Sequence, residues 1–327
     1  MNRQNKLALK LNAKDNVIVA LRDAVPGIEV QKHELIIRDH IPAGHKSAAE
    51  KIEKGALIRK YGQIIGVASR DIDSGEHVHT HNVEMGDFNR GYQIGTEVRP
   101  TDYFSDADRA AFDGIVRDDG RVATRNYIGV LPTVGCSASV CRYIADALNR
   151  EILSAYPNVD GVVGLTQTSG CGMAPNGPGF ENLQRSLAGY ARHPNFWGVL
   201  FVGLGCEVNQ LELLLDDNRL TTDAKVRTLS IQETGGTEAT INRGVALIKK
   251  MLPEANHIKR QPVSASHLTL GLECGGSDAY SGITANPALG EAADLVVRNG
   301  GTVILSETTE IYGAEHLLVE RAVSQEV

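Results

Sequence analysis

From residue 127 onward, apolar runs rich in β-branched residues alternate with segments of helical periodicity. The runs cover residues 127–134, 162–165, 199–204, 227–231, 267–272 and 303–305. The segments between them carry apolar residues at helical spacing, as Val140, Ile144 and Leu148 do in the first. Strands separated by helices of this length form right-handed crossovers, which build a mostly parallel sheet. The pattern therefore predicts an α/β domain.

Each apolar run ends in a short loop that carries glycine, cysteine or glutamate. The loops are 135–137, 169–172, 205–207, 233–236, 273–276 and 307–310. In α/β proteins, ligands bind at the carboxyl ends of the strands, and functional residues concentrate in such loops. We therefore expect the six loops to gather at one edge of a single sheet and to form one active site.

The composition favours a globular enzyme. The 327 residues suffice for about two domains, and a formal net charge of -7 argues against a nucleic-acid partner. No apolar run reaches the roughly 18 residues of a membrane span, and residues 1–20 lack the apolar stretch of a signal peptide. Five cysteines, four of them in Gly-flanked turns, do not indicate a disulfide framework. We expect a cytoplasmic homo-oligomer that acts on a small molecule and does not contact membranes.

The pattern changes near residues 96–112. Before this segment, short alternating stretches separated by turns such as 42–44 and 73–75 are typical of a small β domain. Residues 96–112, with Pro100 and several aspartates, are predicted to be a linker that ends in a short helix. The predicted organisation is an all-β domain at 1–95, this linker, and an α/β domain at 113–327.

Four cysteines are candidates for thiolate chemistry: Cys136, Cys171, Cys206 and Cys274. Cys136 and Cys171 lie between a predicted strand and the helix that follows it. The positive end of a helix dipole favours a thiolate, a metal ligand or a bound anion. Cys136, Cys171 and Cys206 recur every 35 residues, which suggests a set of iron–sulfur ligands. The alternatives are that free cysteine is often simply buried and that equal spacing follows from equal βα units.

Three histidines form a second candidate site. His77, His79 and His81 alternate with other residues, and alternate side chains of a strand project on one face. Imidazoles arranged in this way suit Fe(II), Zn or Mn, although a solvated polar face is the alternative. His45 and Lys46 follow a turn and are candidates for a base or an anion contact, unless they are merely exposed.

Two segments are candidates for holding a carboxylate. Residues 120–127 offer arginines for bidentate binding and amide donors, although a plain hairpin explains them equally well. Residues 275–287 contain small and hydroxyl-bearing residues before a helix, which lets backbone amides approach an anion.

Together, these motifs make the chain resemble the altronate/galactarate dehydratase family, and within it the altronate dehydratase branch. The matching segments are 120–127, 133–138, 203–209, 274–287 and 307–316, and residues 41–46 and 70–82 resemble the SAF (β-clip) domain of that family. The resemblance implies a small all-β SAF domain followed by an α/β domain with a mostly parallel sheet. Members of the family continue past the position equivalent to Val327, so we expect the α/β domain to be incomplete at its C-terminal side.

The resemblance implies a hydro-lyase that converts D-altronate to 2-dehydro-3-deoxy-D-gluconate. The reaction removes the proton next to the carboxylate and then the neighbouring hydroxyl, and the implied cofactor is Fe(II) or another divalent metal such as Mn. An iron–sulfur cluster is the alternative cofactor. The alternative functions are galactarate dehydratase, sulfolactate sulfo-lyase, and a non-catalytic module that binds sugar acids.

The resulting site predictions fall into three groups. The catalytic candidates are His45, Lys46, Arg125 and Asn126. The substrate-binding candidates are Arg121, Gly275, Gly276, Ser277, Asp278, Thr284 and Asn286. The metal ligands are His77, His79 and His81, with Cys136, Cys171, Cys206 and Cys274 as the second choice.

Overall fold

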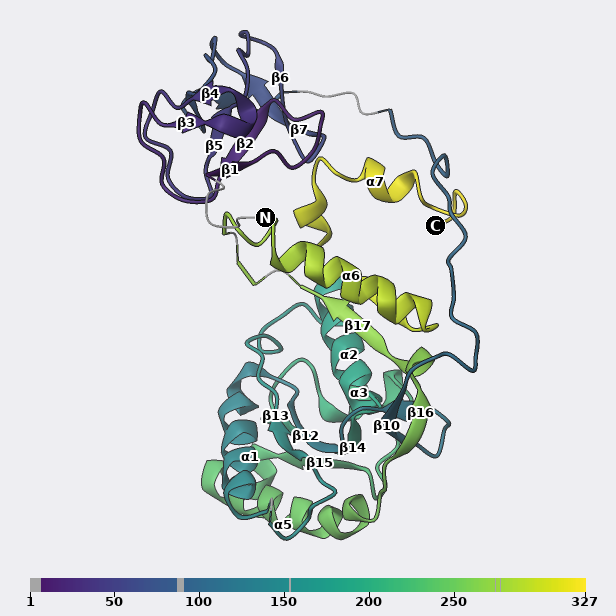
Figure 1. Cartoon of the computed structure of the whole chain (residues 1–327). Helices are drawn as coiled ribbons and strands as arrows, with labels where there is room; N and C mark the ends of the chain where they lie inside the picture. Colours follow the sequence, from purple (N-terminus) through teal and green to yellow (C-terminus); the bar gives the residue numbers. More distant parts are fainter. Residues whose placement is uncertain (1–6, 87–90, 153, 274, 277) are drawn as a thin grey trace. The chain divides into compact units, whose positions relative to one another are not determined.

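The computed structural model describes residues 7–86, 91–152, 154–273, 275–276 and 278–327 (Figure 1). The chain divides into two compact units, Met1–Ala107 together with Leu268–Val327, and Asp108–His267. The predicted domain boundaries at residues 95 and 112 stay predictions. Among the described residues, no helix combines the length and apolar character needed to span a membrane.

The second unit is built on a four-stranded parallel sheet. Its inner strands are β12 (Tyr127–Pro132) and β14 (Phe196–Gly203), and its edge strands are β13 (Gly161–Gly164) and β15 (Val226–Ser230). All three pairings are parallel. Pro132 is the last residue of β12. Its missing amide therefore costs no hydrogen bond in the middle of the ladder.

Helices cover both faces of this sheet (Figure 1). On one face, α1 (Ala138–Ile152) and α5 (Thr237–Asn256) pack against alternate residues of the inner strands. This core includes Ile128, Val130, Leu200 and Val202 from the strands and Ile144, Leu148, Ile248 and Leu252 from the helices. Full burial of such a side chain stabilises the fold by about 1.5–3 kcal/mol.

On the opposite face, α2 (Pro178–Ala191) and α3 (Leu211–Asp217) cover the intervening strand residues. Leu131, Val199 and Phe201 pack there against Leu187 and Leu214. Because β14 is buried on both faces, its sequence reads as a continuous apolar run instead of an alternating one. The predicted α/β domain with a mostly parallel sheet is confirmed.

The second unit also contains a smaller antiparallel sheet and a short helix. A three-stranded antiparallel sheet has the order β11-β10-β16, and a single-turn helix precedes α5. These elements are β10 (Ala111–Val116), β11 (Val122–Ala123), β16 (Gln261–Ser264) and α4 (Ile231–Thr234). The strands β10 and β11 form a hairpin, in which Ile115 pairs with Ala123.

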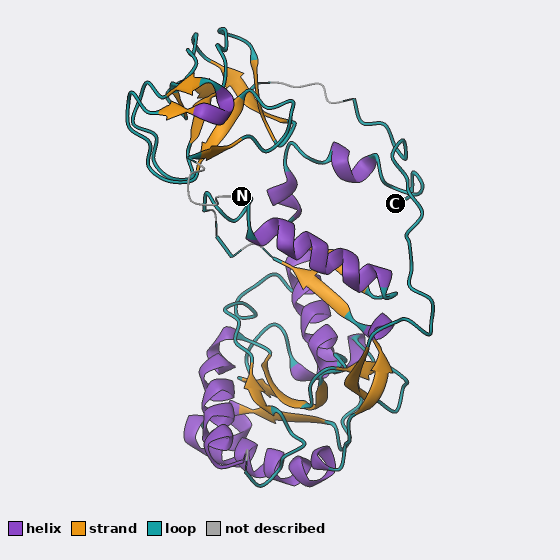
Figure 2. Cartoon of the chain, in the orientation of Figure 1, coloured by secondary structure: helices purple, strands orange, loops and turns teal. Residues whose placement is uncertain are grey.

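The N-terminal β domain, residues 7–86, consists of short strands joined by loops (Figure 2). Its sheets have the orders β1-β2-β5-β8, β3-β4 and β6-β7-β9, and all their pairings are antiparallel. The strands are β1 (Ala8–Leu9), β2 (Val17–Ala20), β3 (Glu29–Val30), β4 (Leu35–Ile36), β5 (Lys46–Ala48), β6 (Leu57–Lys60), β7 (Gln63–Ala68), β8 (His77–Val78) and β9 (Val83–Glu84). This organisation confirms the predicted small β domain.

The C-terminal segment contains a separate two-stranded parallel sheet. It pairs β17 (Thr269–Leu272) with β18 (Thr302–Leu305), joined through α6 (Ala285–Arg298), and a short helix α7 (His316–Val319) follows. The prediction that six loops line one sheet was therefore wrong, since two of them follow β17 and β18. The strand before them, β16, pairs antiparallel with β10 instead of extending the four-stranded sheet, and β17 and β18 pair with each other.

Candidate functional site

The order of the parallel strands places a topological switch point between β12 and β14. The chain leaves β12 through α1 to reach β13 on one side, whereas β14 continues through α3 to β15 on the other. The connections that follow the two inner strands thus run in opposite directions along the sheet. The helix of the first, α1, packs on one face of the sheet, and the helix of the second, α3, packs on the other. In doubly wound sheets, ligands bind at the carboxyl ends of the strands at this switch point.

Three of the predicted cysteines follow strands at this edge of the sheet. Cys136 comes after β12, Cys171 after β13 and Cys206 after β14, and all three are exposed. The neighbouring thiol of Cys136 raises the pKa of Cys171, with smaller contributions from burial, Cys206 and Glu207. Cys136 and Cys206 therefore both lie near enough to Cys171 to influence its thiol. Cys274 lies outside the described residues.

Cys141 has a different environment. It lies on α1 within the core that covers one face of the sheet, and its side chain is fully buried. Burial strongly raises the pKa of its thiol. Its thiol is therefore protonated and inaccessible, and it serves packing only.

A buried polar network holds the loops that carry the cysteines. Thr133 Oγ1 donates to Glu207 Oε1 at 2.7 Å, and Asn209 Nδ2 donates to the Thr133 carbonyl at 3.0 Å. The amides of Leu204 and Gly205 also donate to Glu207, at 3.1 and 2.6 Å. These bonds tie together the loops that follow β12 and β14.

Glu207 keeps its charge although only 3% of it is exposed. Burial alone would raise the pKa of this carboxyl, but the hydrogen bonds from Thr133 and from backbone amides outweigh it and lower the pKa. Thr133, Glu207 and Asn209 lie in the matching motifs 133–138 and 203–209, but no role was predicted for them. A glutamate directly after a strand and beside a Gly-Cys pair is the signal that was available.

Ser137 lies in the turn that precedes α1. Its fully buried hydroxyl donates to the carbonyls of Val134, at 2.9 Å, and Val202, at 2.7 Å. A single turn of 3-10 helix, Gly135–Ser137, precedes α1. Ser137 therefore links the end of β12 to β14 and supports the position of Cys136.

The loop after β13 packs directly on the loop after β12. The Gly135 amide donates to the Ser169 carbonyl at 2.8 Å. Gly170 has a φ of +96°, and a Cβ atom there would lie 2.6 Å from the Thr133 carbonyl oxygen. Only glycine permits this approach, which brings Cys171 beside Cys136.

The substitution Gly170→Ala is expected to destabilise the chain by about 2–3 kcal/mol, because both the backbone conformation and the contact with Thr133 forbid a Cβ atom. Gly172→Ala is the matched control, since its φ is +63° and a Cβ atom there would have no neighbour within 4 Å. It should cost only the strain of the left-handed region, about 1 kcal/mol. Urea unfolding of both variants measures the difference, and equal losses would contradict the assigned contact.

The histidine cluster of the N-terminal β domain consists of His45, His77, His79 and His81. The ring centroids of His45 lie 5.1 Å from those of His77 and His79, and those of His77 and His81 are 5.5 Å apart. His45 Nδ1 lies 3.0 Å from His77 Nε2. The predicted gathering of the three histidines is present, and His45 joins it because β5 pairs with β8.

The reason given for this gathering was wrong. Only His77 lies in a strand, because β8 is two residues long. His79 and His81 lie in the turn that follows, which the fully buried Asn82 organises. Asn82 Nδ2 donates to the His77 carbonyl, and Asn82 Oδ1 accepts from the His79 amide, both at 2.9 Å.

The cluster favours uncharged imidazoles. Burial, followed by the neighbouring His45, His79 and His81, lowers the pKa of His77 to about 4, although Asp39 acts in the opposite direction. The pKa of His79 is also lowered. Burial, followed by Lys60, lowers the pKa of Lys46. Neutral imidazoles have the free lone pairs that a metal ion requires, so the donor set fits a divalent ion in its chemistry.

No preformed metal site accompanies this chemistry. Across the described ranges, no group of three or more His, Cys, Asp or Glu side chains is arranged to hold a metal ion. In the histidine cluster, the facing nitrogens of His45 and His77 contact each other instead of a common point. Rotation of the rings would be needed before they could share one ion.

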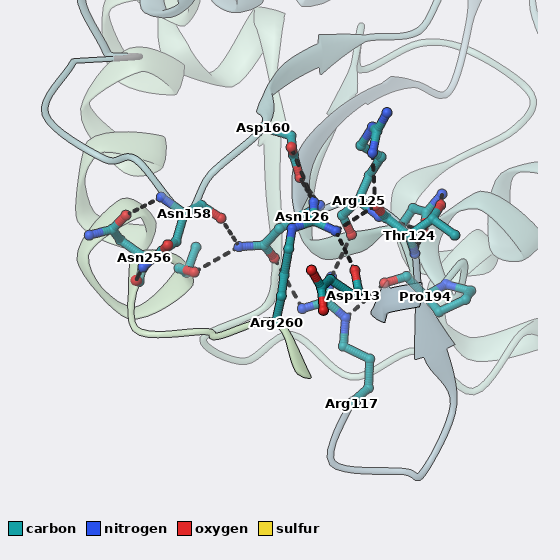
Figure 3. A network of polar contacts seen from close by, with 12 residues as sticks. Asp113, Arg117, Thr124, Arg125, Asn126, Asn158, Asp160, Pro194, Asn256 and Arg260 are labelled. Carbon is teal, nitrogen blue, oxygen red and sulfur yellow. Dashed lines mark hydrogen bonds and ion pairs between the residues drawn. The ribbon is translucent and has the colours of Figure 1, made fainter. Parts of the chain in front are cut away.

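Asn126 and Arg125, predicted to hold a carboxylate, belong to a network of polar contacts (Figure 3) and lie before the amino end of β12. Asn126 directly precedes β12 and is fully buried, and its Nδ2 donates to the carbonyls of Asn158 and Ala255, at 2.7 and 2.8 Å. Its Oδ1 accepts from Arg117 at 3.0 Å. The side-chain amide of Asn126 thus has protein partners at both its nitrogen and its oxygen, and it holds together segments at the amino ends of the strands. This position does not support a role for Asn126 in substrate binding.

Arg121 and Arg125 belong to the same end of the unit. The guanidinium of Arg121 pairs with Asp119 at 2.6 Å, which matches the hairpin interpretation of residues 120–127. Arg125 is exposed, and its Nη1 donates to the Thr124 carbonyl at 3.1 Å. Neither arginine lies at the carboxyl ends of the strands.

The predicted anion loop before α6 is organised by Asp278. Its Oδ1 accepts from the amides of Tyr280 and Ser281, at 2.7 and 3.0 Å. Gly275 and Gly276 are exposed, and Thr284 and Asn286 lie at the start of α6. Ser277 lies outside the described residues. The Asp278 carboxylate therefore shapes the loop, and the loop's role toward an anion stays a prediction.

Three family models match consecutive parts of the chain. Residues 6–86 match the altronate/galactarate dehydratase SAF domain. Residues 114–256 match the D-galactarate dehydratase/altronate hydrolase second domain, and residues 265–327 match the D-galactarate/altronate dehydratase C-terminal domain. The resemblance inferred from the motifs is confirmed.

Characterised relatives are similar over nearly the whole chain. An altronate dehydratase of Bacillus subtilis (strain 168) is 36% identical over 324 residues, which cover 98% of this chain and 64% of the relative. An altronate dehydratase of Escherichia coli (strain K12) is 37% identical over 320 residues, 95% of this chain and 62% of the relative. A galactarate dehydratase (L-threo-forming) of the same strain is 36% identical over 330 residues, which cover 98% of this chain and 62% of the relative. The chain thus spans less than two thirds of the length of these relatives.

Proposed function

Because the chain belongs to the altronate/galactarate dehydratase family, we propose that it acts in the dehydration of a sugar acid, with D-altronate as the first candidate substrate. Two of the similar relatives are named altronate dehydratases, and D-galactarate is the second candidate because a galactarate dehydratase is similarly related. The expected product of D-altronate is 2-dehydro-3-deoxy-D-gluconate.

The observation that carries this proposal is the cluster of four histidines in the SAF domain. Their rings lie 5.1–5.5 Å apart, and Asn82 and the β5–β8 pairing hold the backbone that presents them. We assign His77, His79 and His81 as the ligands of a divalent ion such as Fe(II) or Mn(II). The bound ion would supply a Lewis acid that stabilises negative charge on the substrate carboxylate.

His45 and Lys46 are the proposed proton-transfer groups. One of them takes the proton from the carbon next to the carboxylate, and the electron pair of that bond forms a carbon–carbon double bond. The neighbouring carbon–oxygen bond breaks, and the hydroxyl leaves as water after it receives a proton. The enol that remains tautomerises to the 2-keto-3-deoxy acid. The contact between His45 Nδ1 and His77 Nε2 orients the ring of His45.

Turnover of the longest natural chain that contains this sequence tests the proposal. D-altronate and D-galactarate are supplied separately under anaerobic conditions with Fe(II) or Mn(II), and formation of the 2-keto-3-deoxy acid is followed. His79→Ala is expected to lower kcat/KM at least about 100-fold, since removal of a metal ligand costs more than removal of its supporting partner.

His40→Ala is the matched control for His79→Ala. His40 is an exposed histidine of the same domain and lies 3.9 Å from Asp23, outside the cluster. Its replacement should leave turnover unchanged. No product from either acid, despite bound metal, would contradict the proposed reaction, and full activity of the His79→Ala variant would contradict the assigned ligands.

A further inference from the structure

The proposed reaction leaves the three exposed cysteines at the carboxyl edge of the parallel sheet without a role. Cys136, Cys171 and Cys206 come from three successive strand–helix connections, and hydrogen bonds join the loop of Cys136 to the loops of Cys171 and Cys206. They lie at the topological switch point between β12 and β14, where ligands of doubly wound sheets bind. Three exposed thiols on adjoining loops at such a point need an explanation beyond packing, because free cysteine is usually buried.

The backbone beneath these thiols is held firmly. Thr133 and Asn209 tie the loops of Cys136 and Cys206 together, and the Gly135 amide ties the loop of Cys136 to that of Cys171. The hydroxyl of Ser137 adds a bond of 2.7 Å to the carbonyl of Val202. The anchoring groups are buried, whereas the thiols above them are exposed and can rotate about χ1. A fixed backbone with adjustable sulfur atoms suits a metal site.

A nearby amide group also lacks a partner. Gln167 Nε2, two residues before Ser169, is shielded from solvent and has no hydrogen-bond partner within the described part of the chain. The Oε1 atom of the same side chain accepts from the amide and hydroxyl of Ser169, at 2.6 and 2.8 Å. A shielded donor in the loop of Cys171 is a group that a bound ligand would satisfy.

We propose that Cys136, Cys171 and Cys206 form a metal site with three thiolate ligands and one open coordination position, which takes a thiophilic metal as a single ion or as an iron–sulfur cluster. Soft thiolates select zinc, copper(I) and iron–sulfur clusters over hard ions. Glu207 is not the fourth ligand, because Thr133 and two backbone amides already occupy its oxygens. Three protein ligands and an open position are the arrangement of catalytic metal sites, whereas structural sites are closed.

The site requires a rearrangement of the thiols. In the described residues, no three His, Cys, Asp or Glu side chains already surround a metal position. Binding therefore includes deprotonation of the thiols, with release of protons, and rotation of the exposed side chains toward a common point. No movement of the buried network is needed for such rotations.

Metal binding by the reduced, anaerobic chain tests the proposal independently of turnover. In a Cys274→Ser background, Co(II) serves as the probe for a single ion, and Fe(II) with sulfide serves as the probe for a cluster. We expect thiolate-to-metal charge-transfer absorption with at least one probe. Each of Cys136→Ser, Cys171→Ser and Cys206→Ser should weaken the binding at least about tenfold.

Two control variants isolate the site. Cys141→Ala removes the buried cysteine and should leave the absorption unchanged, and His79→Ala tests for metal bound at the histidine cluster. Circular dichroism confirms that each variant is folded. Absence of thiolate–metal absorption with both probes would overturn the proposal, as would absorption that survives all three cysteine substitutions.

Discussion

Replacement of Asn126 by alanine should lower the free energy of unfolding by about 3 kcal/mol or more. The fully buried amide satisfies the carbonyls of Asn158 and Ala255 and accepts from Arg117. Each buried polar group left without its partner costs about 1–3 kcal/mol. Because the three partners come from separate parts of the unit, their losses add to that of the asparagine itself. Urea unfolding of the variant measures the change.

Arg125→Ala is the matched control beside Asn126→Ala. Arg125 is exposed, and its side chain makes a single hydrogen bond to the adjacent Thr124 carbonyl. Its replacement should change the free energy of unfolding by less than about 0.5 kcal/mol. The same variant tests the carboxylate-binding hypothesis for this residue, since a rise in KM for the sugar acid at unchanged stability would support it. Equal destabilisation by the two variants would contradict the structural role assigned to Asn126.

Replacement of Glu207 by alanine is the second change with a large expected effect, a loss of about 3 kcal/mol or more in the free energy of unfolding. The carboxylate accepts hydrogen bonds from Thr133 and from the amides of Leu204 and Gly205. Bonds to a charged group contribute about 1.5–3 kcal/mol each, and all three donors would be left unpaired. Glu212→Ala, at an exposed position in α3, should stay within about 0.5 kcal/mol of the parent chain.

The pH dependence of the free energy of unfolding distinguishes the contribution of the Glu207 charge from that of the side-chain shape. Its pKa in the folded chain is below the ordinary value of 4.5, so its stabilising contribution is fully present above pH 4.5. That contribution is lost as the pH falls through the lower, folded pKa. Glu207→Gln keeps the shape and removes the titration, so the parent and the variant should converge in stability as the solution becomes acidic. A constant difference between them across this range would contradict the role of the charge.

Much of the α/β unit was predictable because its signals are local. The apolar runs at 127–134 and 199–204 became β12 and β14, and the spacing of Val140, Ile144 and Leu148 became the buried face of α1. Both signals depend on side-chain periodicity within one element. The strand–helix alternation then required a parallel sheet, since crossovers of this length are right-handed.

The site residues were predicted unevenly, for a physical reason. Cysteines that follow strands were expected at the carboxyl ends of the strands, and Cys136, Cys171 and Cys206 follow β12, β13 and β14 there. Asn126 lay in an equally suggestive motif, yet it precedes its strand and therefore lies at the amino edge. The position of a residue before or after a strand thus decides at which end of the sheet it lies, whatever its chemical type.

The sequence by itself determined the type of most elements, the β domain followed by an α/β unit, and the family, because periodicity and contiguous motifs are properties of short segments. Only the tertiary structure decided which strands share a sheet. The strand β16, for example, pairs with β10, which lies more than 140 residues earlier in the chain. The tertiary structure also decided that His45 joins the other histidines across the β5–β8 pairing and that Glu207 reaches Thr133. These contacts join residues far apart in the chain, and periodicity along the chain does not reveal which distant residues will meet.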